Sequence, residues 1–70
     1  MKKQLDWNAV ALKAQEMSIA QLHYAIKDCI AAGDAAWEME KAGCAVSKDQ
    51  GYYYDEAWTY RSEISKRDQA

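Results

Sequence analysis

Proline is absent from all 70 residues of this chain, and glycine occurs only three times. These two residues are the main breakers of regular structure, so a chain that nearly lacks them favours long, uninterrupted helices. Half of the residues are hydrophobic, which argues against disorder even though 29% are charged. A chain this short forms one small domain, often supported by oligomerisation. We therefore expect a single all-α domain over residues 1–70.

A capping box marks the start of the first long helix. Ser18 can accept a hydrogen bond from the backbone three residues on, and Gln21 can reach back to the backbone of Ser18. The helix can then run over residues 19–42, where Gly43 offers the left-handed conformation that commonly follows a helix end.

The same spacing recurs later in the chain and predicts a second long helix. Ser47 is followed by Gln50, and the pattern favours a helix over residues 48–67. The connection between the two helices is short, and short connections place consecutive helices side by side and antiparallel. The sequence therefore predicts an antiparallel helical hairpin.

A shorter helix is expected before the hairpin, within residues 6–17. Asp6 or Asn8 could cap it, and an apolar stripe along it begins at Trp7. This helix either continues into the next one or bends at Met17–Ser18, and the sequence leaves both possibilities open.

The hairpin pattern predicts which residues meet between the two long helices. If the turn centres near residue 45, facing residues have numbers that add up to about 90. Apolar and small residues then form one stripe on each helix, with a close approach of the two backbones at its middle. The predicted facing pairs of this hairpin core are Trp37 with Tyr53, Gly33 with Ala57, Ile30 with Tyr60, and Ile26 with Ile64.

The three consecutive tyrosines cannot all face the partner helix, because neighbouring helical residues are turned by about 100°. Tyr53 belongs to the predicted core stripe, whereas Tyr54 begins a second stripe with Trp58 and Arg61. Either the N-terminal helix with Trp7 or a second copy of the chain could cover this second stripe. A two-helix hairpin cannot hide three tryptophans, so we expect a homo-oligomeric helical bundle, with a dimer favoured. The candidate interface is Trp7, Tyr54, Trp58 and Arg61.

Acidic residues are concentrated around the predicted turn. Residues 28–56 hold seven acidic and two basic residues, a net charge of −5, whereas residues 1–27 carry +2 and residues 57–70 carry +1. One interpretation is ordinary solvated charge; the other is an acidic tip that binds a basic protein surface. This polarity argues against a nucleic-acid partner, because such a partner needs a continuous basic face. The candidate acidic tip is Glu38, Glu40, Asp49, Tyr52, Asp55 and Glu56.

Motifs for catalysis are missing from the sequence, and we expect a protein that is not an enzyme. The single histidine, His23, has no second histidine four residues on and no cysteine pair nearby, so neither a metal site nor a cofactor is expected. Cys29 and Cys44 lack an evident base and oxyanion site, and we expect free thiols. No apolar run is long enough to span a membrane, so a cytoplasmic location is expected.

Aromatic rings beside an arginine also suit the binding of a small nucleotide. Tyr54, Trp58 and Arg61 could stack on a base. We favour an oligomer interface for these residues, but a helical oligomer can also form a ligand pocket between its subunits.

Two segments, LHYAIKDC (22–29) and GYYYDEAWTYRSEISKR (51–67), together resemble short helical proteins of tailed phages and prophages, a group with no established activity. Those proteins carry an apolar-I-K-D segment followed by G-Y-Y-x-D-E-x-x-x-Y-x-x-E-x-x-x-R. The resemblance implies an accessory phage protein in a bacterial cytoplasm that binds a host or defence protein. Alternatives are a sponge for cyclic nucleotides and a structural helical adaptor. The matching residues are Ile26, Lys27, Asp28, Gly51, Tyr52, Tyr53, Asp55, Glu56, Tyr60, Glu63 and Arg67.

Overall fold

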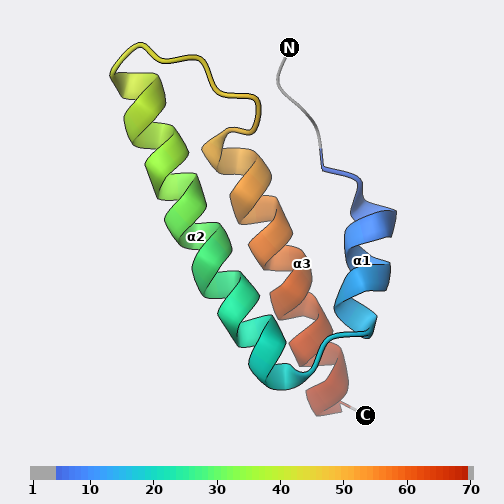
Figure 1. Cartoon of the computed structure of the whole chain (residues 1–70). Coiled ribbons are helices and arrows are strands. Elements are labelled where there is room, and N and C mark those ends of the chain that lie inside the picture. The colour runs from blue at the N-terminus through green and yellow to red at the C-terminus, as the bar shows by residue number, and fades with distance from the viewer. Residues whose placement is uncertain (1–4, 70) are drawn as a thin grey trace.

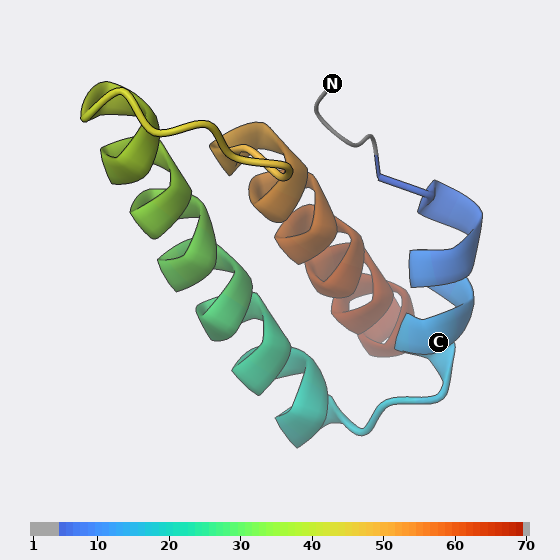
Figure 2. The ribbon, with the colours of Figure 1, turned by 45° about the horizontal axis from the view of Figure 1, so that its top comes forward.

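The computed structural model describes residues 5–69, and this part of the chain forms three helices and no strands. Helix α1 spans Trp7–Gln15, α2 spans Ile19–Lys41 and α3 spans Gln50–Gln69. Helices α2 and α3 form an antiparallel hairpin, and α3 lies between α2 and α1 in both views (Figures 1 and 2). The all-α class is confirmed, and the predicted long helices agree with the observed ones to within two residues at each end.

Both ends of α2 form as the sequence predicts. The Ser18 hydroxyl accepts a hydrogen bond from the Gln21 amide (3.1 Å), and the Gln21 side chain accepts one from the Ser18 amide (2.8 Å). At the other end Gly43 adopts a φ of 89°, which is costly for other residues. The amides of Gly43 and Cys44 donate to carbonyls of the last turn, so the helix ends in a Schellman motif.

The start of α3 differs from the prediction. Asp49 rather than Ser47 caps the helix: its carboxylate accepts a hydrogen bond of 2.9 Å from the Tyr52 amide. A carboxylate is a charged acceptor, and the positive end of the helix dipole stabilises it there. The non-helical connection therefore spans residues 42–49, and Gln50 begins the helix instead of completing a capping box.

Helix α1 is separate from α2, which answers the question the sequence left open. The Asp6 carboxylate caps its start by accepting from the Ala9 amide at 3.1 Å. The helix ends at Gln15, and the chain bends before the cap of α2.

Helix α1 packs against α3 through one apolar stripe and one charged contact. Val10, Ala14 and Met17 contact the core. The Arg67 guanidinium donates to the carbonyls of Ala14 (3.1 Å) and Gln15 (3.3 Å) in the last turn of α1. The Ala14 carbonyl also accepts from the Met17 amide at 3.1 Å. The same guanidinium forms an ion pair of 2.9 Å with Glu63 on α3. Arg67 thus joins the end of α1 to α3.

The contact stripe of the hairpin is rotated on α2 relative to the prediction. On α3, Ala57 and Tyr60 are buried and Tyr53 is half-buried, and Ile26 of α2 and Ile64 of α3 pack at the edge of the core. On α2, however, Ile30 and Trp37 are 42% and 48% exposed and lie outside the contact. The buried residues of α2 are instead Leu22, Cys29, Gly33 and Ala36.

Small residues explain this rotation. The large side chains of Tyr53 and Tyr60 on α3 need space, and Cys29, Gly33 and Ala36 form the stripe of α2 that provides it. A stripe containing Trp37 and Ile30 would hold the two helices farther apart. The tyrosines therefore pack against the small stripe and leave the larger residues outside.

The register along the helices is also shifted. A Cβ atom placed on Gly33 would lie 3.0 Å from the Tyr54 ring and 3.2 Å from the Tyr53 Cβ, so Gly33 faces these tyrosines rather than Ala57. The cause is the path of the connection. Ala45 and Val46 line a hollow together with Met39 and neighbouring alanines of α2, which shows that the chain turns back along α2. Figure 1 shows α2 extending beyond the first turn of α3.

Replacing Gly33 by leucine tests this close approach. We expect the free energy of unfolding of Gly33→Leu to fall by about 1–3 kcal/mol, because the new side chain overpacks against the Tyr54 ring and Tyr53. In a Tyr54→Ala background the loss should be smaller, because part of the obstacle is gone. Urea denaturation followed by circular dichroism gives both values. Ala31→Leu, on an exposed position of α2, serves as the control, and an equal loss in both backgrounds would refute the contact with Tyr54.

Candidate functional site

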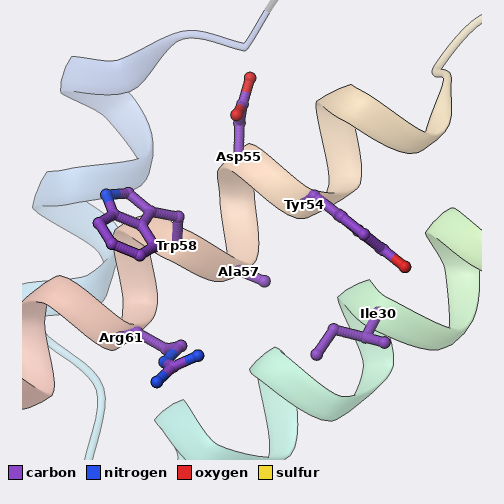
Figure 3. Close-up of a pocket in the computed structure, with 6 residues that line it drawn as sticks. All are labelled: Ile30, Tyr54, Asp55, Ala57, Trp58 and Arg61. Atoms are coloured by element: carbon purple, nitrogen blue, oxygen red, sulfur yellow. The ribbon is translucent and has the colours of Figure 1, made fainter.

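An open groove lies between α2 and α3 on a face that α1 does not cover. It encloses about 420 Å³ and is lined by six residues, of which one comes from α2 and five from α3. Figure 3 shows Tyr54 reaching across toward α2, whereas Trp58 extends away from it. We call this site the α2–α3 groove, and its lining residues are Ile30, Tyr54, Asp55, Ala57, Trp58 and Arg61.

The α2–α3 groove continues toward the open end of the hairpin. Arg61 also lines a neighbouring hollow of about 300 Å³ with His23, Ile26, Ile64 and Ser65. Because Arg61 lines both, the two hollows adjoin each other along the pair of helices. An elongated depression between two helices is the shape that receives another helix.

Tyr54 forms the wall of the groove nearest the turn, and hydrogen bonds hold it in place. Its hydroxyl donates to the Asp34 carboxylate at 2.6 Å. The Gln50 amide donates to the same carboxylate oxygen at 3.2 Å and to the Tyr54 hydroxyl at 3.3 Å. The bond to Asp34 raises the pKa of Tyr54, because losing the proton would place two negative charges side by side.

The sequence predicts Tyr54 on a face that the hairpin leaves uncovered, and this prediction is only partly right. The Tyr54 ring lies over Gly33, and its hydroxyl is bound to Asp34, so one side of the ring is covered by α2. Trp58, by contrast, has 63% of its surface exposed.

The groove carries one charge of each sign on its rim. Asp55 and Arg61 both line it, and both are exposed. Neither side chain forms an ion pair with another residue in the stretch between Leu5 and Gln69. The rim charges are therefore available to a bound partner, and the floor made by Ile30, Ala57 and Trp58 is apolar.

The predicted acidic tip is divided by the fold. Glu38 is exposed and forms an ion pair of 3.0 Å with Lys41, and Asp55 is on the groove rim. Glu40 is half-buried near the end of α2, and Asp49 is the cap of α3 described above.

Glu56 and Tyr52 do not belong to an exposed tip. Glu56 is half-buried and accepts a hydrogen bond of 2.6 Å from the Tyr60 hydroxyl, because its position on α3 turns it toward the core. Tyr52 is half-buried, with its ring beside Tyr53 and with the Lys48 ammonium 5.1 Å from the ring centre.

A polar cluster formed by Cys29, Glu56 and Tyr60 lies inside the hairpin. Burial raises the pKa of Tyr60, and the hydrogen bond to Glu56 raises it further. Burial is also the main cause that raises the pKa of the Cys29 thiol to about 11, with a contribution from the nearby Glu56 carboxylate. A protonated, buried thiol is a poor nucleophile, so the cluster does not form an activated cysteine site.

Residues 5–69 contain neither a cluster of metal ligands nor a membrane-spanning helix. Between residues 5 and 69, no three His, Cys, Asp or Glu side chains come together in a way that could hold a metal ion. In the same part of the chain, no helix combines the length and apolar character needed to cross a membrane. His23 is exposed and lines the hollow next to the groove.

Trp7 begins α1 and is half-exposed. It does not line the groove, so the structure does not join it to Tyr54, Trp58 and Arg61 as one surface.

The sequence interpretation misses the position of one groove residue and one residue that supports the groove. Ile30 is predicted in the core and instead lines the groove floor, and Asp34 is the partner that holds Tyr54. The sequence does contain a clue to the exposed position of Ile30. This residue follows Cys29 of the small stripe and is turned from it by about 100° around the helix. The pairing of Asp34 with Tyr54 depends on the register, and no local pattern indicates it.

Comparison of this chain with protein-family models, with curated proteins and with solved structures finds no match.

The two cysteines should differ sharply in reactivity. We expect a thiol reagent at pH 8 to modify exposed Cys44 quickly and Cys29 only after unfolding, because Cys29 is buried and its pKa is raised to about 11. Mass spectrometry of the folded and urea-unfolded protein counts the modified thiols, and a Cys44→Ser variant isolates Cys29. Rapid modification of both cysteines in the folded protein would contradict the buried position of Cys29.

Proposed function

We propose that this chain is a non-enzymatic binding protein that acts by presenting the α2–α3 groove to another protein. The observation that carries the proposal is the apolar groove itself, whose exposed Trp58 and Ile30 lie beside the anchored Tyr54. Large apolar side chains that gather on one exposed face typically mark interaction sites. Tryptophan and tyrosine are also the residues that contribute most to protein interfaces.

The shape and charge of the groove favour a helical segment as the bound element. An amphipathic helix could place its apolar residues on the floor made by Ile30, Ala57 and Trp58. Asp55 and Arg61 on the rim could pair with charges of either sign and so set its direction.

The charge distribution suggests where a basic partner surface would bind. Asp34 and Glu38 of α2 and Asp55 of α3 are exposed toward the turn end of the hairpin, next to the groove. A partner that contacts both regions would be guided by electrostatic attraction and held by apolar contact.

The biological setting follows from the resemblance of two segments to proteins of tailed phages and prophages. We propose an accessory phage protein that acts in a bacterial cytoplasm by binding a host or defence protein. Such stoichiometric binding suits a chain of 70 residues.

A second candidate function is the binding of a small nucleotide, favoured by Tyr54, Trp58 and Arg61 around one hollow. Asp55 on the same rim opposes it, because its charge repels a phosphate group. Calorimetry against a panel of cyclic and linear nucleotides separates the two functions. We expect no heat of binding from this panel, and saturable binding that Arg61→Ala abolishes would establish the nucleotide function instead.

Trp58→Ala tests the protein-binding function. Trp58 is exposed, so its removal should leave the fold intact and lower the recovery of a partner captured from a bacterial lysate at least tenfold. Tyr24→Ala is the matched control, because Tyr24 is an exposed aromatic residue of α2 outside the groove. Quantitative mass spectrometry of the captured proteins gives the ratio. Equal capture by both variants would place the binding surface elsewhere, and the absence of any captured protein would favour a structural adaptor.

A further inference from the structure

This inference rests on the proposed function of the groove as a protein-binding surface, and it concerns what occupies the groove before another protein takes the site. The charge and symmetry of the molecule identify that occupant. We propose that a second copy of this chain packs on the α2–α3 groove, with its turn end beside the open end of the first copy. The two hairpins together form an antiparallel four-helix bundle.

The apolar residues of the groove suit a two-fold axis. Ile30 is the middle residue of α2, and Trp58 is close to the middle of α3. A symmetric dimer uses the same patch on both subunits, so residues near the axis meet their own copies. An axis perpendicular to the helices at this level brings Ile30 against Ile30 and Trp58 against Trp58. The exposed centre of each groove is then covered by the apolar centre of the other.

The distribution of charge along the hairpin favours one of the two possible directions of the second copy. The half of the hairpin toward its open end holds four basic residues (Lys27, Arg61, Lys66 and Arg67) and three acidic ones (Asp28, Glu63 and Asp68), whereas Asp34, Glu38 and Asp55 are exposed on the half toward its turn. Two hairpins packed with their turns at the same end would bring acidic residues together. Packing with the turns at opposite ends instead places each acidic half beside the less acidic, slightly basic half of the other copy, which is the favourable arrangement.

The charged residues on either side of Trp58 would also face opposite charges in such a dimer. Asp55 and Arg61 stand three positions before and three positions after Trp58 on α3. With Trp58 on the two-fold axis, Arg61 of one copy lies at the level of Asp55 of the other. Both rim charges have no ion-pair partner in their own chain between residues 5 and 69.

Helix α1 leaves this face free. It packs on the part of α3 that carries Tyr60 and Arg67, and Arg67 holds its end there. The stripe of Tyr54, Trp58 and Arg61 points elsewhere on the same helix. A second hairpin can therefore reach the groove without displacing α1. In the resulting bundle every neighbouring pair of helices is antiparallel, as in other four-helix bundles with short connections.

A distance between the two turns tests both the dimer and its direction. Cys44 lies in the connection at the turn end and is exposed, whereas Cys29 is buried. A spin label on Cys44 of the full chain, with one label per chain checked by mass, reports the separation of the two turns by pulsed electron resonance. We expect a distance near the 45 Å length of one copy. Turns at the same end would give roughly 20 Å, about two helix diameters.

Analytical ultracentrifugation supplies the second measurement. Trp58→Ala should raise the dimer Kd by at least about 30-fold, the effect of a central interface residue. The control Tyr24→Ala should leave it within about threefold. Added salt should weaken the dimer, because it screens attraction between opposite charges. Circular dichroism confirms that each variant keeps its helices.

The outcomes separate this inference from the proposed function. A dimer with a long Cys44–Cys44 distance that salt and Trp58→Ala both weaken supports it. A short distance, or a dimer strengthened by salt, overturns the direction. A monomer at all concentrations overturns the dimer itself. If the chain is a monomer but partner capture depends on Trp58, the proposed protein-binding function of the groove is still supported. If capture does not depend on Trp58, both the dimer and the proposed function are overturned.

Discussion

The packing of two α3 tyrosines against a stripe of small residues on α2 determines the rest of this structure. Cys29, Gly33 and Ala36 leave room for Tyr53 and Tyr60, and the close approach at Gly33 brings the Tyr54 ring over α2 as well. Since the small residues take the inner side of α2, its larger apolar residues must remain outside. The same interaction that closes the hairpin therefore creates the exposed groove.

Local signals in the sequence predict the helices well, because each signal depends only on neighbouring residues. Ser18 with Gln21 and the left-handed Gly43 act within a turn of their own helix, and both form as expected. The start of α3 is harder to predict, since Ser47 and Asp49 are both good caps two residues apart. Asp49, whose carboxylate is the charged acceptor, forms the cap. The path of the connection determines which of the two residues lies at the start of the helix.

Tertiary features are predicted less well because they depend on a register that spacing alone does not determine. The turn of about 100° per residue correctly separates Tyr53 from the stripe of Tyr54, Trp58 and Arg61. Symmetric counting from the turn fails, since the connection folds back along α2 and shifts the facing residues. The contact of Tyr54 with Asp34 depends on this register, so no local sequence pattern could predict it. The same holds for the contact of Arg67 with the end of α1.

The central position of α3 also bears on how the chain is made. Helices α1 and α2 both pack on α3, which is synthesised after both of them. Until residues 50–69 have left the ribosome, the apolar stripes of the first two helices have no partner, and isolated helices of such length are marginal in water. These three helices should therefore fold together once α3 has emerged, rather than one after another. Any premature stop within α3 would leave a product with an exposed Leu22 and no core, and such a product is prone to degradation.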